Sequence, residues 1–189
     1  FCKMGGSCFD FANVTNTIFT DTNLSMINAK SANFKRCVFK LCRFDRSNLK
    51  NSIFTNCSFV ACKFGNHISG VSNLTNVKFT DEKINSQNQA RITCCDLSKS
   101  IMNNVIIEGI LITVTSFKES QMKGVKWYNT IIRSSNLHRV NLMDSIFSNV
   151  QCEGTTTFNE ADFTNANLKG LLGSFTYRSK WWLVNGERK

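Results

Sequence analysis

Proline is absent from this chain of 189 residues, glycine occurs only ten times and histidine only twice. A conventional globular β-domain uses more proline and glycine in its turns, so their scarcity favours corners that a regular backbone makes. Long apolar runs are also missing, and none approaches the roughly 20 residues that a membrane-spanning helix needs. These absences argue against a membrane span and against a fold that depends on special turn residues.

Side chains for acid–base, nucleophilic or metal chemistry are scarce as well. Acidic residues number 13 against 23 Lys and Arg, and only His67 and His138 could serve as the base for a Ser or Cys nucleophile. The nine cysteines lack the C-x2-C spacing of zinc sites, and no phosphate-binding glycine loop occurs. We therefore expect no catalytic site, no metal and no cofactor in this region.

A spacing of five residues organises the apolar positions, as in ANFKRCVFKLCRFDRSNLK at residues 32–50. An amphipathic helix would repeat its apolar face at about 3.6 residues and a strand at about 2. We call these positions centres and count them by fives from Met4, with a slip of three residues after Ile84 and one inserted residue within 153–157. Of the 33 centres that end at Leu168, 32 are apolar and only Ser69 is polar, in a chain with 42% hydrophobic residues. This periodicity indicates a repeat architecture.

Small residues precede the centres. Ala, Ser, Thr or Cys stands two residues before most of them, and Asn or Asp often lies between, as in SANF at 31–34, EADF at 160–163 and NANL at 165–168. The pattern resembles the A(D/N)LXX repeat of the pentapeptide-repeat family over roughly residues 2–170. The resemblance implies an all-β fold, a right-handed quadrilateral β-helix, in which each pentapeptide forms one side of a square coil. About eight coils at a strand spacing of about 4.8 Å would make a narrow rod.

Coils of four pentapeptides would stack like residues on one another. We expect ladders of Phe19, Phe39, Phe59 and Phe79, of Cys37 and Cys57, and of Cys42 and Cys62. This use of cysteine as a small core residue, with an odd total, favours free thiols in a reducing compartment such as the cytoplasm of a bacterium or of a host cell.

The domain division follows from where the repeat is regular. We predict the β-helix over residues 1–172, with irregular segments near 65–70, 85–91 and 153–157. Residues 173–189 are predicted to be a C-terminal cap or the start of a following domain, because a solenoid must cover its last coil and Asn185-Gly186 is a typical hairpin turn. We expect the chain to be one domain of a longer protein, and its oligomeric state is left open.

The net charge of +10 indicates an anionic partner. Cations that lie four pentapeptides apart should form columns along the rod, which are either solvated or a surface for acidic protein or nucleic-acid phosphate. His67 lies in an irregular segment, and two adjacent Trp lie near the C-terminus. The candidate partner-binding residues are Arg43, Lys63 and Lys83 in one column, Lys30 and Lys50 in another, and His67, Trp181 and Trp182.

Three functions agree with this pattern to different degrees. The first is a non-catalytic protein-interaction module. The resemblance implies a role such as the recognition domain of a bacterial secreted effector, some of which carry a HECT-like ubiquitin-ligase domain. The second is a DNA mimic that protects DNA gyrase from quinolones, as in the Qnr proteins, but such mimics have an acidic surface and this chain is basic. The third is nonspecific nucleic-acid binding, which lacks surface aromatic residues for stacking. The sequence favours the first.

Overall fold

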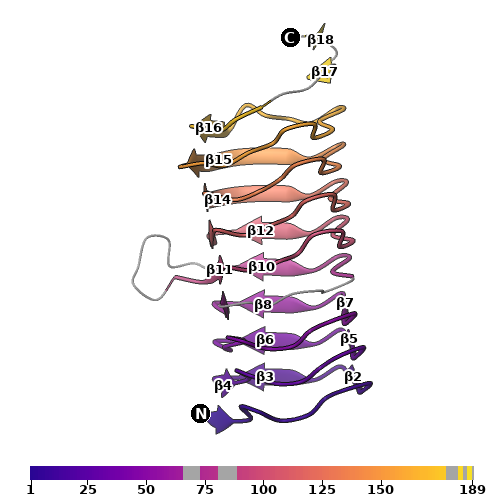
Figure 1. Cartoon of the computed structure of the whole chain (residues 1–189). Coiled ribbons are helices and arrows are strands. Elements are labelled where there is room, and N and C mark those ends of the chain that lie inside the picture. The colour runs from indigo at the N-terminus through magenta and orange to yellow at the C-terminus, as the bar shows by residue number, and fades with distance from the viewer. Residues whose placement is uncertain (66–72, 81–88, 178–182, 185–186, 189) are drawn as a thin grey trace.

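The rod is a stack of square coils made of short parallel strands (Figure 1). In this computed structural model, the described residues are 1–65, 73–80, 89–177, 183–184 and 187–188. The fold class predicted from the sequence is confirmed: a β-helix of about eight turns. None of the described residues forms a helix that is long and apolar enough to cross a membrane.

Each coil has four sides, which we name A to D in chain order from the side that contains Met4. Side A carries β1 (Cys2–Lys3), β4 (Thr22–Asn23), β9 (Lys63–Gly65), β11 (Arg91–Thr93), β13 (Leu111–Thr113) and β16 (Leu171–Gly173). Side B, whose centres include Phe9 and Leu49, is linked by single bridges such as Asn28 to Asn48. Side C carries β2 (Asn13–Thr15), β5 (Asn33–Lys35) and β7 (Ile53–Thr55).

Side D has the most continuous sheet. It carries β3 (Ile18–Thr20), β6 (Val38–Lys40), β8 (Ser58–Val60), β10 (Lys78–Thr80) and β12 (Ile106–Glu108). The longer strands β14 (Lys126–Arg133) and β15 (Ile146–Glu153) run along side D and around the corner onto side A. Beyond the rod, β17 (Leu183–Val184) pairs antiparallel with β18 (Glu187–Arg188) on either side of the predicted turn.

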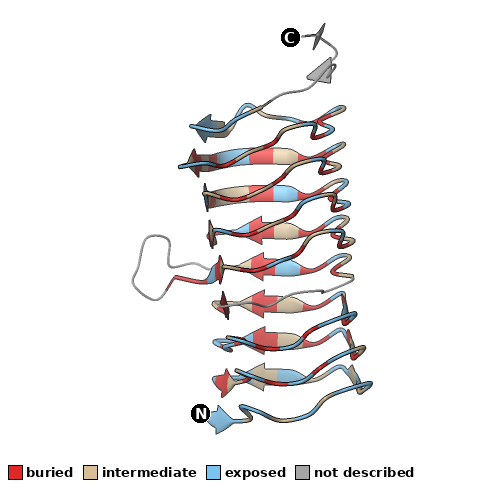
Figure 2. Cartoon of the chain, viewed as in Figure 1, coloured by how far each residue is buried: buried red, intermediate tan, exposed pale blue. Residues whose placement is uncertain are grey.

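The centres fill the interior of the square, as the five-residue period predicts. Among the centres of the described chain, those from Leu24 to Phe163 are all buried (Figure 2), whereas Met4, Phe9, Val14 and Phe19 at the amino end are half-buried. The predicted Phe ladder is confirmed, because Phe39 stacks on Phe19 at 4.9 Å and on Phe59 at 4.8 Å between ring centroids. The coil spacing of a parallel sheet thus equals a favourable stacking distance for aromatic rings.

The small residue two positions before each centre lies inside the square and hydrogen-bonds to the backbone. The Ser47 hydroxyl donates to the carbonyl of Leu24 at 2.8 Å, and the Thr115 hydroxyl donates to the carbonyl of Ile92 at 3.3 Å. Thiols take the same position, since Cys62 Sγ donates to the carbonyl of Phe39 at 3.2 Å. A short side chain with one donor therefore fits where the coil is narrow, and a backbone carbonyl is close enough to accept from it. Ser145 is an exception, because its buried hydroxyl has no hydrogen-bond partner within the described residues.

Corners are made by left-handed backbone at the second residue after a centre. Among the described residues, 24 non-glycine residues at such positions have φ between 47° and 59°, and Asn or Asp supplies ten of them. Asn and Asp tolerate this conformation better than other L-residues. A second Asn or Asp, just before the centre, accepts a hydrogen bond from the backbone N–H two residues on, as Asn73 does from Thr75 at 2.8 Å. The corners are therefore regular, as expected, and the backbone of one residue at each of these corners is in the left-handed conformation.

Two changes of register divide the stack. On side A, Arg43 pairs with Lys63, its equivalent one regular coil further along the chain, but Lys63 pairs with Arg91 and not with the equivalent Lys83. Eight extra residues are therefore inserted between Thr80 and Arg91. A single extra residue lies between Glu153, which pairs with Arg133, and Thr157, which pairs with Asn136. The insertion of eight residues explains the slip of three residues in the sequence. Eight residues are one whole five-residue unit, which leaves the period unchanged, plus three residues, which shift it.

The predicted boundary at residue 172 falls within β16. This strand pairs with β15, and Thr176 still bridges to Thr157 on side B. Tyr177 packs against the ring of Phe163 at 6.0 Å between centroids. The predicted cap over 173–189 stays a prediction.

Candidate functional site

The basic column of side A occupies the position just before each centre, which points out of the square. Consecutive members face one another in register, so that Arg43 is beside Lys63 and Lys63 is beside Arg91. Arg91 pairs with Lys63 at the position where the regular period would place the predicted third member, Lys83. Lys83 itself lies outside the described residues. We call Arg43, Lys63 and Arg91 the basic column.

One carboxylate, that of Asp45, neutralises part of the positive charge of the basic column. Asp45 Oδ2 lies 3.3 Å from Arg43 Nη2, and its side chain leans over Gly65 on the next coil, where an added Cβ would come within 2.7 Å of Asp45 Oδ1. Arg91 is exposed and makes no ion pair within the described part of the chain. The basic column therefore keeps a net positive charge at the end that meets the insertion.

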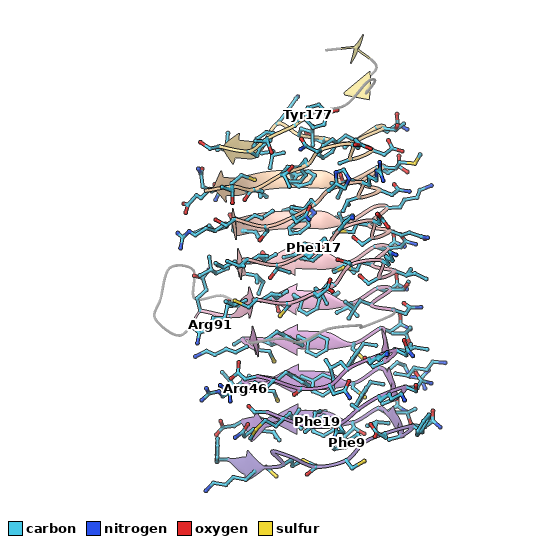
Figure 3. The ribbon with its side chains drawn as sticks, in the orientation of Figure 1. Phe9, Phe19, Arg46, Arg91, Phe117 and Tyr177 are labelled. Atoms are coloured by element: carbon cyan, nitrogen blue, oxygen red, sulfur yellow. The ribbon has the colours of Figure 1, made fainter. Side chains whose placement is uncertain are left out.

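The second predicted pair lies on the neighbouring side. Lys30 and Lys50 follow centres of side B in adjacent coils, and the N–H of Ser31 bonds to the carbonyl of Lys50. Between this pair and the basic column stands Arg46, the left-handed corner residue with φ 58°. Arg46 and Arg91 carry their guanidinium groups outside the ribbon, while Phe19 and Phe117 lie within it (Figure 3).

Arg46 and Arg91 were missed by the sequence interpretation. Arg46 could have been found, because residues 30–50 contain seven Lys and Arg but a single acidic residue. This interval spans one full coil, so its cations surround the rod on all four sides. Arg91 could be found only with the true length of the insertion.

Comparison with known proteins agrees with the geometry. A family model described as pentapeptide repeats matches residues 30–66 with eight copies. Residues 30–66 belong to the pentapeptide-repeat family. No curated protein matches it. Pentapeptide-repeat proteins are structural scaffolds and are generally non-catalytic.

Two solved structures share the pentapeptide-repeat fold. QnrB1, a plasmid-mediated fluoroquinolone resistance protein, is 16% identical over 92% of this chain and 90% of its own, with a TM-score of 0.50. HetL, a pentapeptide repeat protein involved in heterocyst differentiation regulation from the cyanobacterium Nostoc sp. strain PCC 7120, is 13% identical over 98% of this chain and 93% of its own, also with a TM-score of 0.50. At these identities, the likeness establishes the fold alone.

The buried cysteines of the pentapeptide repeats have a structural role. Burial raises the pKa of the Cys57 thiol to about 12, and it raises the pKa of Cys152 to about 12 as well. A hydrogen bond that the Cys62 thiol donates to Cys42, together with burial, raises the pKa of Cys62. All nine cysteines are free, and only Cys2 and Cys8 are exposed. Among the described residues, no three His, Cys, Asp or Glu side chains gather in a metal-binding arrangement.

Three other predicted site residues cannot be placed. His67, Trp181 and Trp182 lie outside the described residues. Their proposed contacts with a partner stay predictions. The site that can be built from described side chains is the basic column with Arg46, Lys30 and Lys50 beside it.

Proposed function

We propose that this region is a non-catalytic scaffold that binds an acidic surface of a partner protein through the basic column. The observation that carries the proposal is the register of Arg43, Lys63 and Arg91 on one side of a regular coil. Their spacing comes from the backbone pairing, so no ordering of loops is needed when a partner binds. A preformed array of this kind lowers the entropic cost of association.

Electrostatics supports an acidic partner. Cations at the coil spacing of about 4.8 Å repel one another by at most about 0.9 kcal/mol per pair in water before salt screening. Carboxylates placed between them convert this repulsion into attraction and speed association. Asp45 pairs with Arg43, whereas Arg91 makes no ion pair within the described residues, so Arg91 keeps its full positive charge.

Two other functions have weaker support. A gyrase-protecting DNA mimic needs an acidic surface, and the likeness to QnrB1 concerns the fold, while this chain carries a net charge of +10. Single-strand nucleic-acid binding needs exposed aromatic rings. Among the described residues the large exposed aromatic side chains are Phe1, Phe11 and Phe175, none of which neighbours the basic column in the sheet pairing.

The thiols support a reducing compartment for this function, whether bacterial cytoplasm or, for a secreted effector, the host cytosol. Cys37, Cys42, Cys57 and Cys62 donate S–H groups to backbone carbonyls inside the rod, which requires the reduced form. Thiol titration of the unfolded protein, isolated from its source cells without reductant, should give nine reactive groups per chain. A lower number would contradict a reducing compartment.

Charge reversal with a matched control tests the binding function. Immobilised wild-type protein is compared with Arg43→Glu/Lys63→Glu/Arg91→Glu on side A and with Lys40→Glu/Lys78→Glu/Lys126→Glu on side D, after nuclease treatment of a source-cell lysate. Bound proteins are quantified by mass spectrometry. We expect a protein that the side D variant retains at the wild-type level and the side A variant loses at least tenfold. Equal loss in both variants, or binding that nuclease abolishes, would contradict the proposal.

A further inference from the structure

The line of outward side chains that begins with the basic column continues beyond Arg91. On the next coils, the same outward position of side A is taken by Leu111, then Ile131, then Gln151, then Leu172, each paired in register with the one before. Leu111 and Ile131 are half-exposed, and Leu172 is 50% exposed. A single straight line of side chains along side A therefore changes from cationic to aliphatic at the middle of the rod.

The residues beside this line leave it accessible. One step beyond the centres, side A carries Gly65, Thr93 and Thr113 on the three coils where the change occurs. These side chains are shorter than those of Lys63, Arg91 and Leu111, so the line stands above its neighbours. At the adjacent corner Val114 is 55% exposed and has φ 50°. A β-branched residue in the left-handed region is strained.

The spacing of the line selects the kind of partner segment. Side chains along it recur at the coil spacing of about 4.8 Å. An α-helix parallel to the rod presents one residue per turn at about 5.4 Å, whereas an extended strand presents alternate residues at about 6.6 Å. The six steps from Arg43 to Leu172 span about 29 Å. Six turns of a helix exceed this length by less than one coil spacing, whereas six repeats of a strand exceed it by more than two coil spacings. Roughly 20 residues of helix cover this length.

We infer that side A binds an amphipathic α-helix of a partner protein. This helix carries carboxylates on successive turns of one half, opposite Arg43, Lys63 and Arg91, and aliphatic side chains on the other half, opposite Leu111, Ile131 and Leu172. The inference rests on the proposed protein-binding function and specifies its partner. Charge complementarity fixes which half of the helix meets which half of the rod, and the aliphatic half supplies burial that carboxylates alone cannot.

Synthetic helices and two pairs of variants test this geometry. The probe is a 24-residue helical peptide with three Glu and then three Leu on successive turns of one face, in an Ala and Gln background. A second peptide has Ser in place of the three Leu. Affinities are measured by fluorescence anisotropy at two salt concentrations. Wild-type protein should bind the Glu–Leu helix at least tenfold more tightly than the Glu–Ser helix.

The variants separate the two halves of the line. Leu111→Thr/Ile131→Thr should weaken binding of the Glu–Leu helix about tenfold without changing its salt dependence. Arg43→Gln/Arg91→Gln should reduce the salt dependence. The matched controls on side D are Ile106→Thr/Ile146→Thr and Lys78→Gln/Lys126→Gln. They should change neither the affinity for the Glu–Leu helix nor its salt dependence. Ile106 and Ile146 are half-exposed on side D of the same rod, with Lys126 paired between them. Circular dichroism and urea unfolding verify that each variant folds.

Several outcomes would overturn the inference. The first is equal affinity for the two helices, and the second is an equal loss of affinity in the side A and side D variants. The third is binding of a 12-base-pair DNA duplex as tightly as the Glu–Leu helix, with an affinity that Leu111→Thr/Ile131→Thr does not change. The proposed function has a separate readout. If a natural partner is lost by the charge-reversal variant of side A but retained by Leu111→Thr/Ile131→Thr, the protein-binding function stands and the two-part helix is wrong.

Discussion

The coils before the insertion and those after it share one backbone but differ in chemistry. Residues 1–80 contain ten basic and three acidic residues, whereas residues 89–177 contain eight and seven. In the first half, Phe rings stack in the interior, as Phe44 does on Phe64 at 4.8 Å, and thiols such as Cys62 share the narrow positions with hydroxyls such as Ser47. In the second half, aliphatic and Met centres such as Ile112 and Met122 dominate, with hydroxyls in the narrow positions.

Surface charge follows the same division. Ion pairs between neighbouring coils occur in the second half, such as Arg133 with Glu153 at 2.6 Å and Arg139 with Glu160 at 2.7 Å. In the first half, the described ion pairs are Arg43 with Asp45 and the N-terminus with Asp21. The square coil therefore requires buried residues at the centres and two positions before them. It leaves ring, thiol and charge chemistry free to serve function.

The largest expected effect comes from emptying the Phe ladder. Phe39 is fully buried and contacts Phe19, Phe59 and Phe44. Phe39→Ala should lower the free energy of unfolding by about 3–5 kcal/mol, because the cavity adds to the lost burial. Met122→Leu, at an equivalent centre of the second half, conserves volume and should cost less than about 1.5 kcal/mol. Urea unfolding followed by circular dichroism measures both, and equal losses would show that removing the Phe39 ring leaves no costly cavity.

Buried thiols should make the protein less stable in alkali. The folded-state pKa of Cys57 is raised to about 12 by burial, so its thiol stays protonated while the unfolded chain ionises. This contribution is complete below pH 9 and is lost as the pH rises towards 12, by no more than about 1.4 kcal/mol per pH unit. The stability difference between wild type and Cys57→Ala should therefore shrink from pH 8 to pH 10.5. Cys152→Ala gives the same test in the second half, and a constant difference would contradict the assignment.

Corner residues allow a stabilising substitution. Val114 has φ 50° and Leu41 has φ 57°, and both side chains are at least half exposed. Val114→Asn should raise the free energy of unfolding by about 1 kcal/mol, because Asn adopts the left-handed conformation more readily than a β-branched residue. Leu41→Asn in the first half should give a smaller gain. Thermal unfolding measures both, and a loss of stability in Val114→Asn would show that the corner is not strained.

The smallest effects concern surface charge and should differ in sign between the halves. Arg133→Gln removes an exposed ion pair with Glu153 and should cost about 0.5 kcal/mol at low salt. Lys50→Gln removes a cation from the interval with seven Lys and Arg and should raise stability slightly. Both changes should fade at 1 M salt, where the screening length is about 3 Å. Effects of equal sign, or effects insensitive to salt, would contradict the charge asymmetry.

The five-residue period was sufficient to predict the interior. Phe34 and Phe54 stack at 4.7 Å because the period assigns both to equivalent centres of adjacent coils. The length of the insertion was not predictable, because adding a whole five-residue unit leaves the period unchanged. For that reason the column was assigned to Lys83 and not to Arg91. Left-handed corners at residues such as Val114 were also hidden, since the chain uses almost any residue there.

The insertion itself has a consequence for how the rod can change. Thr80 pairs with Val60 on one side and Glu108 on the other, and Arg91 pairs with Lys63 and Leu111, so both ends of the added segment are held by complete coils. Doubling the length of a flexible connection costs only about 0.6 kcal/mol. This corner can therefore accept guest sequences, such as an epitope or a small domain, and display them beside Arg91 without redesign of the coils that hold it.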